Sequence, residues 1–246
     1  MNIKDTVVII PVLNEKDSIK DVIDNLPMNR LLAVVVVDNG STDGTDQVIY
    51  QTQAHLVKEP IRGYGMACLS GIKKALTFKP ENIAFIDGDF SDYPQELDLL
   101  LNKLDQGLDL VIGSRMLGGA GPGSLLPQAR WGNWLACKLM HLFYPHFKFS
   151  DLGPFRAIKT QNLIELNMQD QNFGWTVEMQ LKALSGRLKC QEVSVSYRKR
   201  IGHSKITGTV LGTIKASAKI LYTLGKFFWN TRKKSPTDLP VAADGK

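Results

Sequence analysis

The chain has 246 residues, which is enough for one α/β domain with a sizeable core. Hydrophobic residues make up 43% of the sequence and charged residues 22%, a balance typical of a globular protein rather than a disordered one. The net charge of +6 favours a polyanionic ligand or an anionic membrane surface as partner. No nucleic-acid motif accompanies the basic residues, so we expect no nucleic-acid partner.

The three cysteines, Cys68, Cys137 and Cys190, lie far apart in the sequence. Their spacing indicates a reducing compartment and neither a disulfide framework nor a zinc site. The first residues lack the pattern of a signal peptide, and no run of about 18 or more apolar residues predicts a membrane span. We therefore expect a cytoplasmic protein.

Strands and helices are predicted to alternate in the first half of the chain. Short apolar runs rich in β-branched residues predict buried strands over residues 7–11, 33–37, 55–58, 82–86 and 108–112. Helices are expected between them, over residues 15–26, 45–51, 66–76 and 94–104. This alternation is typical of an α/β fold with a Rossmann-like, mostly parallel, doubly wound sheet. In such sheets ligands bind at the carboxyl ends of the strands.

The second half of the chain is less regular. It predicts strands over residues 155–159 and 189–197 and helices over residues 128–143, 176–185 and 207–230. The last residues are polar and include two prolines, which is typical of a disordered tail. We therefore expect a globular domain over residues 1–206, a carboxyl-terminal helix over 207–230 and a tail over 231–246.

Two carboxylates one residue apart, Asp87 and Asp89, directly follow the strand predicted over 82–86. Carboxylate oxygens suit a hard divalent cation, which would offset the charge of a diphosphate. The alternative is a loop that caps the next helix. Asp92, just before Pro94, already offers such a cap and leaves the two earlier carboxylates for a metal.

Three more features fall where ligands are expected. Asp38 ends a predicted strand and suits a ribose or base edge, although it could be a simple turn aspartate. Gly63 lies in a glycine-rich turn before a helix, where backbone and helix amino-terminus favour anions. Arg115 follows another strand and could bind phosphate through two hydrogen bonds, or form a surface salt bridge.

Basic residues gather again near the end of the expected domain. Arg198 and Arg200 would share one face of a strand, and Ser204 and Lys205 follow closely. This cluster either binds phosphate or forms a solvated charged edge.

Taken in order, these motifs resemble glycosyltransferase family 2, whose fold is known as GT-A, and within it the polyprenol-phosphate mannose and glucose synthases. The resemblance covers about residues 5 to 230 and rests on the segments 11–15, 38–45, 62–67, 87–89, 113–115, 155–156 and 200–205. It implies inverting transfer of one sugar from a nucleotide diphosphate sugar, of the GDP-mannose or UDP-glucose type, to a polyprenyl phosphate. It also implies Mg2+ or Mn2+ as cofactor, with residues 1–206 as the catalytic domain.

The resemblance implies roles for individual residues. It gives catalytic roles to Asp89, Arg115, Arg200 and Lys205. It implies nucleotide binding by Pro11, Leu13, Glu15, Asp38, Gly63 and Asp87. It implies contact with acceptor or other phosphate groups for Arg130, Arg156 and Ser204, and metal binding for Asp87 and Asp89. A phosphate acceptor needs no general base, whereas a hydroxyl acceptor would need one, for which Glu178 is a candidate.

The chain departs from the family pattern at Asn39, at Ser91 and Asp92, and at Pro154. These departures leave the donor and the acceptor open. One alternative function is transfer to the hydroxyl of a small molecule or lipid. Another, from a different class, is a catalytically retired module that binds a membrane surface.

The helix predicted over 207–230 is amphipathic. Its lysines fall on one side, at Lys215, Lys219 and Lys226, and its apolar residues gather on another. This pattern is typical either of a helix lying in a membrane interface or of one packed on its own core. A lipid-phosphate acceptor would require the first, with the protein attached to the cytoplasmic membrane face.

Overall fold

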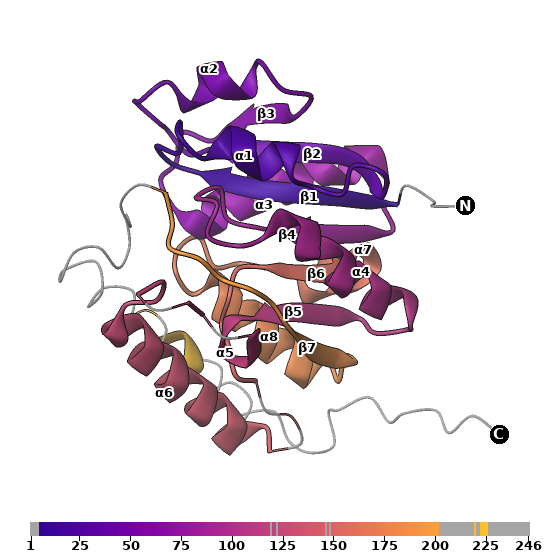
Figure 1. Ribbon diagram of the computed structural model, residues 1–246. Coiled ribbons are helices and arrows are strands. Elements are labelled where there is room, and N and C mark those ends of the chain that lie inside the picture. Colours follow the sequence, from indigo (N-terminus) through magenta and orange to yellow (C-terminus); the bar gives the residue numbers. More distant parts are fainter. Residues whose placement is uncertain are drawn as a thin grey trace.

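The structure is a computed structural model that describes residues 5–118, 120–121, 123–145, 147, 149–201, 219 and 222–225. Within these residues, seven strands form one sheet in the order β3-β2-β1-β4-β6-β5-β7 (Figure 1). The strands are β1 Thr6–Val12, β2 Leu31–Asp38, β3 His55–Lys58, β4 Asn82–Phe85, β5 Leu110–Ser114, β6 Arg156–Lys159 and β7 Cys190–Ser194. Only β6 runs antiparallel to its neighbours, β4 and β5, so the predicted mostly parallel sheet is confirmed.

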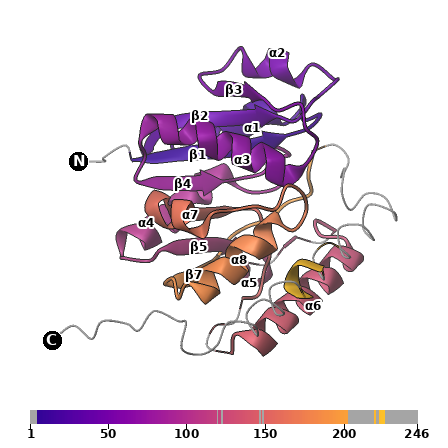
Figure 2. The same ribbon diagram turned by 180° about the vertical axis from the view of Figure 1, so that it is seen from behind.

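Helices cover both faces of the sheet. They are α1 Ile19–Asp24, α2 Thr45–Ile49, α3 Tyr64–Ala75, α4 Leu97–Asp105, α5 Arg115–Gly118, α6 Pro127–Phe143, α7 Thr160–Leu166 and α8 Trp175–Ser185, with 3-10 turns at Leu76–Phe78 and Pro94–Glu96. Helices α1 and α4 lie on the face seen in Figure 1, and α3, α7 and α8 lie on the face seen in Figure 2. The doubly wound arrangement expected from the alternation is therefore present.

The core lies in two layers because side chains alternate along each strand. In β1, Val7 and Ile9 pack toward α3 and α8, whereas Val8 and Ile10 pack toward α1 and α4. All four are fully buried, which is why β1 is apolar from Val7 onward rather than alternating with polar residues. Burial of each such side chain contributes about 1.5–3 kcal/mol.

Two predictions about helix starts were wrong. The helix predicted from residue 15 begins only at Ile19, and before it the Asn14 Oδ1 accepts a hydrogen bond from the Thr42 amide at 2.8 Å. Asp92 does not cap a helix either. Its side chain is buried, and within the described residues neither carboxylate oxygen has a hydrogen-bond partner. Burial raises the pKa of Asp92 well above its usual value, which favours the neutral acid.

Other elements differ in extent. The pattern did not predict the short helices α5 and α7, and β7 ends at Ser194 rather than reaching residue 197. The tail predicted over 231–246 lies outside the described residues. Of the helix predicted over 207–230, the structure describes residues 219 and 222–225, and these are helical. Among the helices that the structure describes, none combines the length and apolar character needed to cross a membrane.

Candidate functional site

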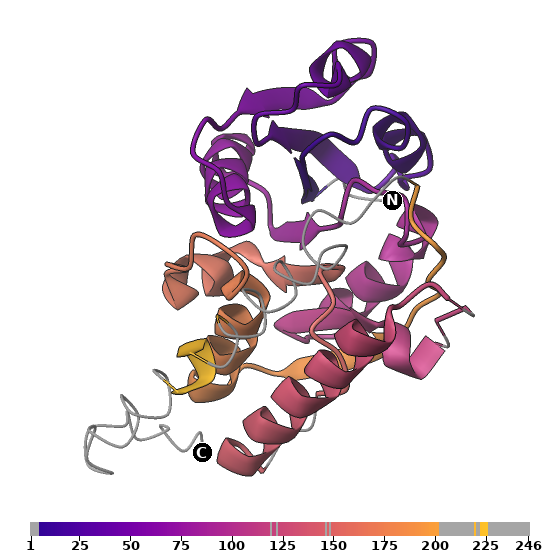
Figure 3. The same cartoon turned by 90° about the vertical axis from the view of Figure 1, so that its left-hand side faces the viewer.

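A cavity of ≈ 270 Å³ opens at the carboxyl ends of β1, β2 and β4. Figure 3 looks onto this edge of the sheet. Five residues expected at the nucleotide line the cavity, namely Pro11, Leu13, Glu15, Gly63 and Asp87. The remaining lining residues include Asp89, Arg200, Asn39, Tyr64, Asn172 and Phe173. Segments far apart in the sequence therefore meet where a parallel sheet is expected to bind ligands.

Asp89 lines the cavity and is paired with a positively charged side chain of the protein, Arg200. It is 3% exposed, and its Oδ2 pairs with the Arg200 Nη2 at 2.5 Å. Its Oδ1 accepts hydrogen bonds from the Ser91 amide at 2.9 Å and the Ser91 hydroxyl at 2.5 Å. The structure thus brings together Asp89 and Arg200, which are far apart in the sequence.

Asp87 is the second carboxylate of the pair, and its charge is unfavourable in this setting. Desolvation by the surrounding protein, helped by the charge of Asp89, raises the pKa of Asp87 to about 7, although Arg200 opposes the rise. The Tyr64 hydroxyl donates to the Asp87 Oδ1 at 3.1 Å. A site that disfavours a second negative charge has a physical reason to accept a divalent cation.

The carboxylate pair fits a cation that takes most of its ligands from elsewhere. Within the described residues, no group of three or more histidine, cysteine, aspartate or glutamate side chains could hold a metal ion. Mg2+ is commonly held by one or two carboxylates together with water and substrate phosphates, and it needs no cage of protein ligands. Asp87 and Asp89 suffice for that arrangement.

Asp38, which was expected to contact the nucleotide, is not among the residues that line the cavity. It is buried, and its Oδ1 accepts a hydrogen bond from the Ser41 amide at 2.8 Å, as a turn aspartate does. The next residue, Asn39, lines the cavity instead. Its amide donates to the Ile61 carbonyl at 2.7 Å and accepts from the Gly63 amide at 2.8 Å, and thereby holds the glycine-rich turn in place.

Arg115 forms a salt bridge, the alternative predicted for it, but the bridge is largely buried rather than on the surface. Its Nε and Nη2 bind Asp151 at 2.8 Å and 2.6 Å, and its backbone amide donates to the same side chain at 2.8 Å. Glu192 in turn accepts hydrogen bonds from the amides of Ser150 and Asp151 at 2.9 Å. In this arrangement Arg115 stabilises the loop after β5, and its phosphate-facing role is not supported.

Arg156 is fully buried and cannot face a phosphate group, so this expectation was wrong. Its guanidinium donates to the backbone carbonyls of Leu152, Gly153 and Thr176. Burial lowers the pKa of Arg156 to about 10. Arg130 is exposed on α6 and is not among the residues that line the cavity. Ser204 and Lys205 lie outside the described residues.

Glu178, the candidate base, has a structural role in holding a loop. Its carboxylate is buried, accepts hydrogen bonds from the amides of Gln169 and Asp170, and pairs with Lys182 at 2.8 Å. It therefore holds the loop that continues to Asn172 and Phe173, both of which line the cavity. No sequence pattern predicted a site at these two residues, because they follow a helix rather than a strand.

The same loop packs directly on the glycine-rich turn. The Met66 amide donates to the Gln171 carbonyl at 2.9 Å. A Cβ atom at Gly65 would lie 2.0 Å from the Asp170 carbonyl oxygen, and one at Gly63 would lie 2.2 Å from that of Gln171. Glycine is required at both positions because backbone approaches backbone, which is a different reason from the predicted approach to a ligand.

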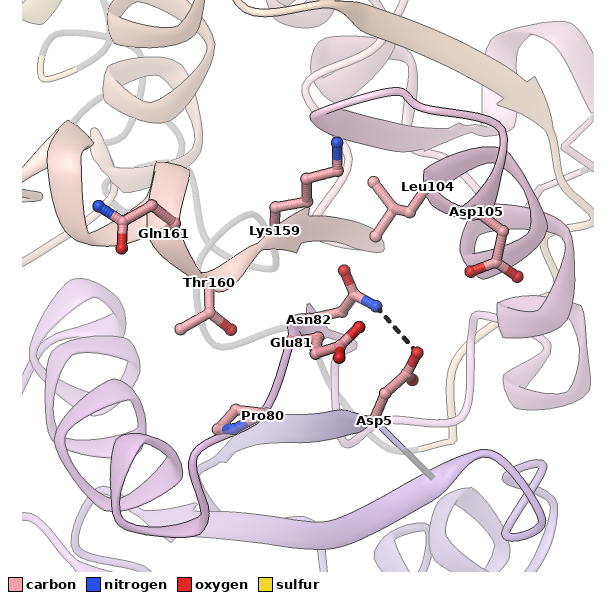
Figure 4. A pocket seen from close by; sticks show the side chains of 9 residues that line it. All are labelled: Asp5, Pro80, Glu81, Asn82, Leu104, Asp105, Lys159, Thr160 and Gln161. Atoms are coloured by element: carbon pink, nitrogen blue, oxygen red, sulfur yellow. Dashed lines mark hydrogen bonds between the residues drawn. The ribbon is translucent and has the colours of Figure 1, made fainter. Parts of the chain in front are cut away.

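A larger cavity, of ≈ 620 Å³, lies at the opposite edge of the sheet, where β1 and β4 begin (Figure 4). Its titratable lining residues are Asp5, Glu81, Asp105 and Lys159. Asp105 pairs with Arg30 at 2.9 Å and Lys159 with Asp109 at 3.2 Å. Three carboxylates against one lysine would repel a diphosphate, so the smaller cavity is the better candidate despite its size.

Comparison with known proteins identifies the family. The family model for glycosyl transferase family 2 matches residues 7–166, which contain the strands and the acidic pair that build the cavity. An uncharacterized glycosyltransferase of Mycobacterium tuberculosis (strain ATCC 25618 / H37Rv) is 32% identical over 212 residues, covering 85% of this chain and 93% of that protein. The polyprenol monophosphomannose synthase of Mycolicibacterium smegmatis is 27% identical over 224 residues, covering 83% of this chain and 82% of that protein.

Solved structures show the same fold. Glucosyl-3-phosphoglycerate synthase from M. tuberculosis, in complex with Mn2+, UDP and phosphoglyceric acid, superimposes with a TM-score of 0.72 at 20% identity. The match covers 91% of this chain and 78% of that one. The expected GT-A fold is confirmed. The expectation of a glycosyltransferase enzyme is also confirmed, in preference to the alternative of a retired binding module. The chain belongs to glycosyl transferase family 2.

Proposed function

We propose that this glycosyltransferase transfers one sugar from a nucleotide diphosphate sugar to a polyprenyl phosphate, with inversion at the sugar carbon. The observation that carries the proposal is the carboxylate pair of Asp87 and Asp89, which lies in one cavity wall together with Arg200. The residues around the pair, from Pro11 to Phe173, would hold the nucleoside. Donors of the UDP-glucose and GDP-mannose types both remain candidates.

Asp87 and Asp89 would hold Mg2+ or Mn2+, which when bound offsets charge on the departing diphosphate. Arg200 supplies a second, fixed positive charge. Although burial opposes it, the neighbouring carboxylates of Asp89 and Asp87 raise the pKa of Arg200, so it stays charged at all relevant pH values. A charge fixed in the cavity before reaction stabilises negative charge that develops in the transition state.

The state of Glu178 favours a phosphate acceptor over a hydroxyl. A hydroxyl acceptor needs a base, and the Glu178 carboxylate is occupied by two backbone amides and Lys182. A phosphate acceptor is already ionised near neutral pH and needs none. Similarity to the polyprenol monophosphomannose synthase supports the proposal of a polyprenyl phosphate acceptor. Because the fold is also similar to that of glucosyl-3-phosphoglycerate synthase, a soluble acceptor is the second candidate.

An exposed face of α6 supports membrane attachment. Trp131, Trp134 and Leu142 are 62%, 53% and 72% exposed. With exposed Lys138 they follow helical spacing along one face, while Ala136 and Met140 face the core. Indole rings beside basic residues are typical of a helix lying in an anionic lipid interface. Helix α6 crosses the lower part of the view onto the carboxyl edge (Figure 3).

Helix α6 is also joined to the cavity side of the sheet. The Asn133 amide donates to the Ser150 carbonyl at 2.8 Å and accepts from the Leu152 amide at 2.8 Å. The residue between them is Asp151, the partner of Arg115. We therefore propose that the enzyme is peripheral on the cytoplasmic membrane face and that α6 contributes to its attachment.

The first test concerns the metal. Asp89→Asn is expected to lower transfer at least about 10³-fold, because one ligand of the cation and the partner of Arg200 lose their charge. The measurement is Mn2+-dependent transfer from UDP-glucose or GDP-mannose to a prenyl phosphate, with exposed Asp21→Asn as the matched control. Wild-type turnover by a folded Asp89→Asn protein would refute the metal role.

The second test uses the pKa of Asp87. Since the carboxyl group must lose its proton before it binds a cation, Mn2+ affinity is expected to rise with pH between 5.5 and 8. Below about pH 7 the affinity falls by up to tenfold per unit, because proton and cation compete for Asp87. Electron paramagnetic resonance of Mn2+ alone would measure it, and Asp87→Asn should flatten the profile. A pH-independent affinity in the wild-type chain would contradict the account.

The third test concerns α6. The double variant Trp131→Ser, Trp134→Ser is expected to bind phosphatidylglycerol vesicles at least about tenfold more weakly, because interfacial burial of two indoles is worth roughly 2 kcal/mol or more. Flotation of the full chain measures binding, and Tyr50→Ser, which removes another exposed aromatic ring, is the control. Equal flotation of all three proteins would argue against α6 as a membrane contact.

A further inference from the structure

The segment after β7 lies antiparallel along the loop that carries Asp89. Tyr197 forms an isolated antiparallel bridge with Asp92. The Arg198 amide donates to the Ser91 carbonyl at 2.9 Å, and the Ile201 amide donates to the Asp89 carbonyl at 3.0 Å. Residues 195–201 and 89–93 therefore form one paired unit, which contains both Asp89 and its partner Arg200.

The sequence predicted that the two arginines of this unit share one face, but their side chains have different partners. Arg200 pairs with Asp89, whereas Arg198 lies over the aromatic rings of the loop. The Arg198 Cζ is 3.5 Å from the centre of the Phe90 ring and 4.0 Å from that of Tyr93. Its Nε donates to the Phe90 carbonyl at 2.6 Å and its Nη2 to the Asp92 carbonyl at 3.2 Å.

Phe90 has a backbone conformation that needs external support. Its φ is 58°, in the left-handed region, which is unfavourable for a residue with a Cβ atom. Such a residue persists only where its surroundings hold it. Phe90 directly follows Asp89, and the turn it makes places the Ser91 amide and hydroxyl on the Asp89 Oδ1. Arg198 contacts both the ring and the carbonyl of Phe90.

We propose that Arg198 is a positioning residue that acts through Phe90. It holds the left-handed turn and so keeps the Asp89 carboxylate directed at Arg200 and the cavity. This inference rests on the proposed function, in which Asp89 binds the cation. Lysine cannot replace arginine here, because a compact ammonium lacks the planar group that contacts two rings and two carbonyls at once.

The test measures Mn2+ affinity by electron paramagnetic resonance on the full chain, together with kcat and the donor KM. Arg198→Lys is expected to weaken Mn2+ binding about tenfold and to lower kcat about 10- to 100-fold, as a displaced catalytic group does. The KM for the donor should change less than about threefold, since the residues lining the nucleoside part of the cavity are untouched. Lys199→Gln, an exposed neighbour, is the matched control.

A second comparison asks whether Arg198 acts through Phe90. Glycine adopts a left-handed conformation without strain, so Phe90→Gly makes the turn independent of the stacking. In the Phe90→Gly background, Arg198→Lys is expected to change Mn2+ affinity less than about threefold. A merely structural Arg198 would lower the melting temperature and the folded fraction but leave the Mn2+ affinity of the folded protein unchanged.

The outcomes separate this inference from the proposed function. Wild-type Mn2+ affinity and kcat in Arg198→Lys would overturn the positioning role while loss of transfer in Asp89→Asn upholds the metal site. An equal loss from Arg198→Lys in the Phe90 and Phe90→Gly backgrounds would overturn the route through Phe90. Full transfer by Asp89→Asn would reject the proposed function and, with it, the inference that rests on it.

Discussion

Two carboxylates held close together at the end of β4 are the constraint on which the rest of the site depends. Asp87 and Asp89 are like charges in a region poor in water. Desolvation and the charge of Asp89 together raise the pKa of Asp87 to about 7. The protein offsets part of the charge with Arg200 at 2.5 Å from Asp89. A divalent cation would offset more, which links the electrostatics of the pair to the chemistry of a departing diphosphate.

Several elements of the fold serve to hold this pair and the cavity beside it. Ser91 and the segment 195–201 fix the loop that carries Asp89. On the other side of the cavity, Glu178 fixes the loop 169–173 by accepting its backbone amides. That loop packs on the backbone of Gly63 and Gly65 so closely that no side chain would fit. The walls are therefore set by backbone contacts between distant segments.

The sequence predicted the features that depend on local pattern. Apolar runs gave the strands of a mostly parallel sheet, and the position of Asp87 and Asp89 after β4 placed the acidic pair at the ligand-binding edge. The roles of residues that have several available partners were harder to predict. Arg115 follows a strand as predicted, but its guanidinium is paired with Asp151. No local sequence pattern predicts a partner 36 positions away.

Burial explains most of the other differences. Arg156 and Asp92 are charged residues in the sequence, yet both side chains are enclosed by the packed core, so neither phosphate binding nor helix capping follows from residue type. Asn39 rather than Asp38 lines the cavity because β2 continues through Asp38, one residue beyond the strand predicted over 33–37. Ser204, Lys205 and the amphipathic pattern over 207–230 stay predictions.

The central claim is that the carboxylate pair, a divalent cation and a nucleoside diphosphate bind as one unit. Calorimetry of UDP and of GDP binding, with Mn2+ and with EDTA, tests it most directly, in the wild-type chain and in Asp89→Asn. The account predicts that Mn2+ tightens binding of the preferred nucleotide at least about tenfold in the wild type, and that this gain disappears in Asp89→Asn. Equal affinity with and without Mn2+ in the wild-type chain would contradict it.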